Sequence, residues 1–114
     1  MSKISMQQFD IIMGIDVIAR NICIEIEFCI NEDPEYDSCW LGKTGVTVEE
    51  IKYEVFWYGL VADGSQAYEY YSAEEFSNAP VFRGKSIKDL WDKVIINSID
   101  GCSVEYRLPY YLGL

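Results

Sequence analysis

The side chains that most often do chemistry in proteins are sparse in this chain of 114 residues. It contains no histidine, so Ser-His-Asp and Cys-His nucleophilic sites and a histidine general base are excluded. Its four cysteines form no C-x-x-C pair, and the usual spacing of zinc ligands is therefore missing. We interpret them as small buried hydrophobic residues in a reducing compartment, and we predict no metal and no cofactor. They are Cys23, Cys29, Cys39 and Cys102.

Carboxylates dominate the remaining reactive groups, and four of them surround a tyrosine in the segment 31–38. Closely spaced carboxylates can bind calcium, but the EF-hand pattern D-x-[DN]-x-[DN]-G is absent here. We therefore interpret the segment as a solvated acidic loop. An exposed acidic loop with an aromatic side chain is also a suitable contact surface for a basic protein. The residues are Glu32, Asp33, Glu35 and Asp37, on either side of Tyr36.

Phosphate-binding and catalytic motifs are incomplete. Gly84-Lys85-Ser86 matches only the end of a P-loop, whose first glycine would stand where the chain has Ala79. Ser86 is better explained as the N-cap residue of a helix. No dinucleotide signature is present, and no pair of carboxylates stands out as a glycosidase-like acid and base. These absences predict a protein that is not an enzyme.

The negative charge is concentrated in the middle of the chain. The formal net charge is −10, and residues 21–80 hold thirteen Asp and Glu against Lys43 and Lys52 alone. Such a field repels nucleic acid and anionic membranes and attracts a basic partner, although acidity can also serve solubility alone. No apolar run approaches the ~20 residues of a membrane-spanning helix. The first ten residues lack the pattern of a signal peptide, so we expect a cytoplasmic location.

Two patterns predict strands. Residues 51–71 read as a hairpin, because two runs rich in Tyr, Phe, Trp and Val flank the turn pair Asp63-Gly64. Residues 21–30 alternate with a period of two, which predicts one buried face and places Glu25 and Glu27 together on the wet face. Between these patterns, the polar and glycine-containing segment 31–45 reads as a long irregular connection.

The rest of the chain supplies a second hairpin and the helices. An Asp-Gly pair at 100–101 predicts a hairpin with strands over 94–99 and 102–108. Serine caps predict helices that start at Ser5, Ser72 and Ser86, although a strand competes with the helix over 5–18. The expected fold is α+β: a single domain over residues 1–114, with a mainly antiparallel sheet of about five strands built from two hairpins. Two or three short helices pack on one face of that sheet.

A compact, acidic domain without histidine, carrying aromatic residues among its carboxylates, resembles the small immunity proteins of bacterial toxin systems. The resemblance is one of class and rests on no family motif. It implies protein–protein contact with a basic toxin domain, typically a nuclease, whose lysines and arginines would meet carboxylates in place of phosphates. The alternatives are a homo-oligomeric interaction module, in which a homodimer forms, and a small-molecule-binding domain. The expected partner-binding residues are Glu32, Asp33, Glu35, Tyr36, Asp37, Glu49, Glu50 and Glu54.

Overall fold

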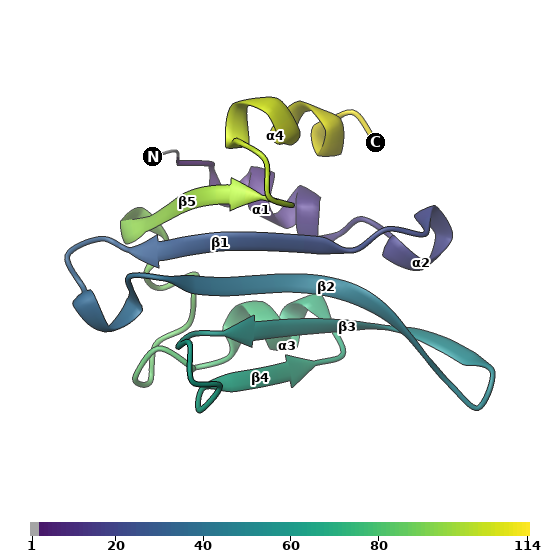
Figure 1. The fold of residues 1–114 in the computed structure, drawn as a ribbon, viewed down its shortest axis with the longest axis horizontal. Coiled ribbons are helices and arrows are strands. Elements are labelled where there is room, and N and C mark those ends of the chain that lie inside the picture. Colours follow the sequence, from purple (N-terminus) through teal and green to yellow (C-terminus); the bar gives the residue numbers. More distant parts are fainter. Residues whose placement is uncertain (1–2) are drawn as a thin grey trace.

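A five-stranded antiparallel sheet with the order β4-β3-β2-β1-β5 forms the centre of the protein, as the computed structural model of residues 3–114 shows (Figure 1). The strands are β1 (Ile24–Ile30), β2 (Cys39–Val48), β3 (Ile51–Gly59), β4 (Ala67–Tyr70) and β5 (Val94–Ile99). The helices are α1 (Met6–Met13), α2 (Val17–Arg20), α3 (Ala73–Asn78) and α4 (Val104–Leu112), with short 3-10 turns η1 (Pro34–Tyr36) and η2 (Trp91–Lys93). The predicted α+β class is confirmed. None of these helices has the length and apolar character needed to cross a membrane.

The core lies between one face of the sheet and the helices. Every second residue of β1, from Ile24 to Ile30, is buried there, as the alternation predicts. On strand β3, the Tyr58 ring stacks on Phe76 of α3 with 4.2 Å between centroids. The Tyr58 hydroxyl donates to the Phe76 carbonyl oxygen at 2.8 Å. Burial raises the pKa of this phenol, and the interaction fixes α3 against the sheet.

Two of the three predicted capping signals start α-helices. Ser5 and Gln8 form a reciprocal capping box at the start of α1, and the helix ends at Gly14. Asp16 caps α2, so the predicted helix over 5–18 is two helices separated by a short break. Ser72 accepts a hydrogen bond from the backbone of Glu75 and starts α3, which confirms the helix predicted from Ser72.

The predicted hairpin over 51–71 is confirmed, because β3 and β4 pair antiparallel with Phe56 opposite Tyr70. The irregular connection predicted over 31–45 is wrong in its second half, where β2 begins at Cys39. Strand β2 then pairs with β3 through a two-residue turn, Glu49-Glu50, in which both residues have a positive φ. The sheet therefore contains a long β2–β3 hairpin that the sequence did not indicate.

The second predicted hairpin is also wrong beyond Ile99. Residues predicted as a strand over 102–108 lie mostly in α4, which Ser103 caps by accepting a hydrogen bond from the Tyr106 backbone. Val104 and Tyr111 face the core because their separation of seven residues is two helical turns. The helix predicted from Ser86 keeps its cap to Asp89, but the segment forms turns and η2 before β5 begins at Val94.

Candidate functional site

The second face of the sheet is the one turned toward the viewer in Figure 1, with α1 and α3 behind it. Its strand positions alternate with those that fill the core, and several large side chains on it remain open to solvent. Trp40 of β2 is 37% exposed, Trp57 of β3 is half-buried, and Tyr71 at the end of β4 is exposed. We call this surface the open face. An apolar, aromatic sheet face without a covering layer is unusual in a small domain and marks a candidate contact surface.

The pairing register places acids and tryptophans in neighbouring rows across the open face. One row runs from Glu25 through Gly42 and Trp57 to Glu69, across four strands. The next row runs from Ser98 through Glu27 and Trp40 to Gly59. Because directly opposite residues have Cβ atoms about 4.5–5.5 Å apart, Trp57 neighbours Glu69 and Trp40 neighbours Glu27.

Gly42 gives Trp57 its position. A Cβ atom on Gly42 would lie 2.5 Å from Cζ2 of Trp57 and 2.2 Å from the backbone oxygen of Ile24, so no larger residue fits. The indole therefore lies close to the backbone of β2 instead of projecting into solvent. Closer to the turn of the β2–β3 hairpin, Tyr53 packs against Tyr71 with 5.8 Å between ring centroids.

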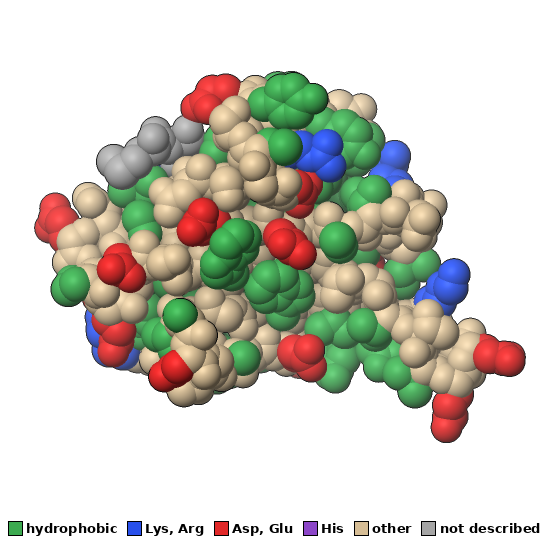
Figure 2. All heavy atoms as spheres, in the orientation of Figure 1, with side chains coloured by type: hydrophobic (Ala, Val, Ile, Leu, Met, Phe, Trp, Pro, Cys, Tyr) green, Lys and Arg blue, Asp and Glu red, His purple; other side chains and the backbone are tan. Residues whose placement is uncertain are grey.

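The charged groups of the open face are all acidic. At its strand positions among residues 3–114, it carries Glu25, Glu27 and Glu69 and no lysine or arginine. Glu25 and Glu69 are exposed, and Glu27 is half-buried beside Ser98. Figure 2 shows hydrophobic side chains in the middle of this face with acidic side chains around them. The face thus combines aromatic surface with negative charge that forms no ion pair within residues 3–114.

The acidic loop predicted as the contact surface is held together by an arginine. Arg83 pairs with both Asp33 and Glu35, and its guanidinium lies 4.8 Å from the centroid of the Tyr36 ring. Tyr36 is buried and packs edge-on against Phe82, so its ring belongs to the core. Desolvation lowers the pKa of Arg83, but the carboxylates of Asp33 and Glu35 together outweigh it and raise this pKa above its usual value.

The remaining predicted contact residues lie elsewhere. Glu32 and Asp37 are exposed in the same loop as Arg83's partners, whereas Glu49 and Glu50 form the turn at the opposite end of the long axis (Figure 1). Glu54 accepts a hydrogen bond from the Val17 backbone and forms an ion pair with Lys43 on the helix side of the sheet. The structure therefore brings five of the eight predicted residues together in one loop and places three outside it.

Lys43 is a buried cation that the sequence did not single out. Its Nζ donates to the backbone oxygens of Met13 at 2.9 Å and Ile15 at 2.6 Å, and lies 3.1 Å from Glu54. The last carbonyls of a helix carry partial negative charge, so an ammonium group is favourable at this position. Its contacts connect β2 to the end of α1 and to β3, which indicates a structural role.

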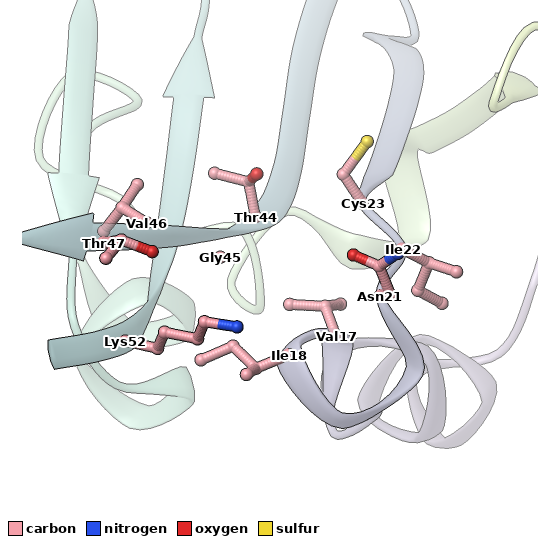
Figure 3. A pocket seen from close by; sticks show the side chains of 10 residues that line it. All are labelled: Val17, Ile18, Asn21, Ile22, Cys23, Thr44, Gly45, Val46, Thr47 and Lys52. Atoms are coloured by element: carbon pink, nitrogen blue, oxygen red, sulfur yellow. The ribbon is translucent and has the colours of Figure 1, made fainter. Parts of the chain in front are cut away.

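A groove of about 440 Å³ opens where the chain leading into β1 separates from β2 (Figure 3). Its lining is mixed: aliphatic side chains from α2, two threonines, and Lys52 as its one charged group. Among residues 3–114, no group of three or more cysteine, aspartate or glutamate side chains is arranged to hold a metal ion. The lining residues are Val17, Ile18, Asn21, Ile22, Cys23, Thr44, Gly45, Val46, Thr47 and Lys52.

Sequence reasoning placed Glu25 and Glu27 on a wet strand face but missed Trp40, because residues 31–45 read as a loop. The signal that could have found it is the alternation of Cys39, Leu41 and Lys43 with Trp40 between them. Comparison of the chain with protein-family models, with curated proteins and with solved structures finds no match. The class that the fold defines is an α+β domain with an open, acidic and aromatic sheet face.

Proposed function

We propose that this protein binds a basic protein partner on the open face of its sheet. The observation that carries the proposal is the arrangement of Trp40 and Trp57 among Glu25, Glu27 and Glu69, with no base at the strand positions of that face in the described chain. Tryptophan and tyrosine are the residues that most often dominate binding energy at protein interfaces. Carboxylates around them attract cationic surfaces and discriminate against acidic ones.

The kind of partner follows from the charge and the class resemblance. With a net charge of −10, the protein is attracted to a strongly basic surface such as the phosphate-binding site of a nuclease. We propose that the protein is an immunity protein and that this partner is a toxin nuclease, inhibited through protein–protein contact in the cytoplasm. Carboxylates would then occupy positions that nucleic acid phosphates otherwise take.

The open face is a better contact surface than the acidic loop for a physical reason. Two of the loop carboxylates already pair with Arg83, and Tyr36 is buried, so a partner would have to compete with internal contacts. Glu25 and Glu69 have no such competitor in an ion pair within the described chain. The loop residues Glu32 and Asp37 remain available at the edge of a larger interface.

The experiment compares two aromatic truncations. The probes are immobilised basic nuclease domains from bacterial toxins, and binding is measured from about 50 mM to about 300 mM salt. For a domain that binds, we expect binding to weaken as salt rises, and Trp40→Ala to weaken it by about tenfold or more. Tyr106→Ala is the matched control, because Tyr106 is a 74% exposed aromatic residue on α4, away from the open face. Circular dichroism is recorded for both variants to check that they fold.

Two outcomes would contradict the proposal. Absence of binding to every basic domain tested would remove the partner class. Equal losses for the two truncations would remove the open face as the site. Self-association, the alternative function, is followed in parallel by sedimentation: a dimer that forms at micromolar concentration and dissociates in Tyr106→Ala would favour an oligomerisation module built on α4.

A further inference from the structure

Strand β2 has a partner on only one side over its last five residues. The β1–β2 ladder ends at the pair Ile24–Lys43, whereas β2–β3 pairing continues to Val48–Ile51. The chain before β1 turns away, because the Ile22 N–H donates to the Val17 oxygen at 3.1 Å instead of continuing the ladder. Within the described part of the chain, residues 44–48 therefore form a strand edge without a partner, where the hairpin projects beyond β1 (Figure 1).

The register determines which backbone groups point out of that edge. In a two-residue hairpin the residues that flank the turn, here Val48 and Ile51, form a hydrogen-bonded pair. Alternation then turns the N–H and C=O groups of Thr47 and Gly45 away from β3. The other end of the ladder agrees: the Glu25 backbone bonds to Asp100, on the β5 side, which leaves Ile24 to bond β2.

This edge lacks the features that usually protect a strand from pairing. It reads Thr-Gly-Val-Thr-Val, without lysine, proline or a bulge. At the opposite edge of the same hairpin, Tyr71 packs beside β3 on Tyr53, whereas Lys52 of β3 lines the groove beside the β2 edge. At the ends of the sheet, β4 has only four residues and β5 is in contact with α4. The β2 edge is thus the one best suited to accept a strand.

The groove in Figure 3 lies beside the same edge. Gly45 has no side chain, and a Cβ atom there would lie 3.1 Å from Cγ1 of Ile18. In an antiparallel pair, the residue opposite Gly45 would point its side chain to this side, over Ile18 and Val17. The groove of about 440 Å³ can hold one aliphatic side chain of an added strand.

We propose that residues 44–48 of β2 pair with an extended segment of the basic partner, which adds a strand to the sheet. The identity of that partner rests on the proposed function. The segment presents an aliphatic residue opposite Gly45 and basic residues where it passes Glu49 and Glu50. A second copy of this chain is disfavoured as the occupant, because two molecules that each carry a net charge of −10 repel one another.

The first test uses a synthetic peptide and amide hydrogen exchange. The probe is an acetylated heptapeptide, Lys-Val-Thr-Val-Thr-Val-Lys, and the control is the same peptide with its five central amides N-methylated. In the free protein we expect the Gly45 and Thr47 amides to exchange fast and the Val46 amide, which faces β3, to exchange slowly. Excess probe should slow Gly45 and Thr47 by about tenfold, and the N-methylated peptide should not. Slow exchange at Gly45 and Thr47 without peptide, or equal effects of both peptides, would overturn the inference.

The second test separates this inference from the proposed function. Thr47→Pro removes the outward N–H without removing a β2–β3 hydrogen bond, and Thr47→Ala is its matched control. With a nuclease domain that binds in a Trp40-dependent manner, Thr47→Pro should weaken binding by about tenfold and Thr47→Ala by less than about twofold. Unchanged binding would overturn strand addition and leave the proposed function intact. If the peptide protects Gly45 and Thr47 but no basic domain binds, strand addition is supported and the proposed function is overturned.

Two further measurements complete the design. One uses a replacement variant if Thr47→Pro does not fold, and the other tests a second copy of this chain as the occupant. If Thr47→Pro is unfolded by circular dichroism, Gly45→Val replaces it, because the added side chain occupies the groove; loss of peptide protection supports the inference and unchanged protection overturns it. Sedimentation of the wild-type protein tests the second copy. A dimer whose formation protects Gly45 and Thr47 would overturn the heterologous strand and assign the edge to self-association.

Discussion

The ammonium group of Lys43 lies 3.1 Å from a carboxylate oxygen of Glu54, and the lysine side chain is only 3% exposed. The same carboxylate accepts a hydrogen bond from the backbone N–H of Val17 at 3.0 Å, and Lys43 also binds the Met13 and Ile15 carbonyls. The pair therefore connects β2 and β3 to the break between α1 and α2. It anchors the helices behind the β2–β3 hairpin. The β2 edge and the open face of this hairpin carry the proposed contacts.

Removing the lysine should destabilise the fold. Lys43→Met leaves two carbonyl oxygens and a partly exposed carboxylate without their cation, and we expect a loss of about 3 kcal/mol in the free energy of unfolding. Urea denaturation measures it. In the double variant with Glu54→Gln, the unpaired charge is gone and the Val17 contact is kept, so the cost should be clearly less than the sum of the single changes. Simple additivity would show that the two side chains do not act as a pair.

The close approach of Trp57 to Gly42 predicts a second effect on stability. A methyl group at Gly42 meets the Ile24 backbone, which cannot move without disturbing the β1–β2 ladder. We expect Gly42→Ala to cost about 1–3 kcal/mol and to shift the tryptophan emission as the indole is displaced. Gly59→Ala is the control on the same face, where an added Cβ would have no atom within 4 Å. Similar costs for both variants would mean that strand propensity, and not the indole, sets the preference for glycine.

Alkaline pH should unfold the protein partly through a buried thiol. Burial raises the pKa of Cys39 from 9.0 to about 12. Because this pKa is higher in the folded state, the associated stability is complete below the unfolded value and is lost as pH rises through the folded value. The urea midpoint should therefore fall from about pH 8 to about pH 10, and less so in Cys39→Ala. Cys23→Ala, at an exposed thiol, should retain the wild-type slope; a flat wild-type profile would contradict the shift.

The elements that the sequence predicts correctly are those in which apolar and polar residues alternate without interruption or a strong turn pair is present. Strand β1 alternates without exception, and the β3–β4 hairpin has an Asp-Gly turn. Strand β2 was hidden because two glycines and a lysine interrupt its pattern, and both glycine positions depend on neighbours distant in sequence. Gly42 lies against Trp57 and Ile24, and Gly45 lies against Ile18. Only the assembled sheet supplies those reasons.

The hidden hairpin turn and the last helix have different explanations. Glu49 and Glu50 have φ values of 51° and 70°, a conformation that costs an ordinary residue about 1–2 kcal/mol and that sequence patterns assign to Asn or Gly. The pairing of β2 with β3 must offset that cost. In α4, β-forming residues adopt a helix because Ser103 caps it and because Val104 and Tyr111 reach the core only at helical spacing. The open face could not be predicted because Trp40 belongs to the hidden strand.

The affinity of a basic nuclease domain for two matched double variants tests the central claim most directly. Glu25→Lys with Glu69→Lys reverses charge on the open face, and Asp10→Lys with Glu74→Lys makes the same net change at exposed positions on α1 and α3. We predict that the open-face variant loses about tenfold or more in affinity at about 100 mM salt, and the helix variant less than about threefold. Equal losses would show that the partner responds to net charge alone, and would contradict a binding site on the open face.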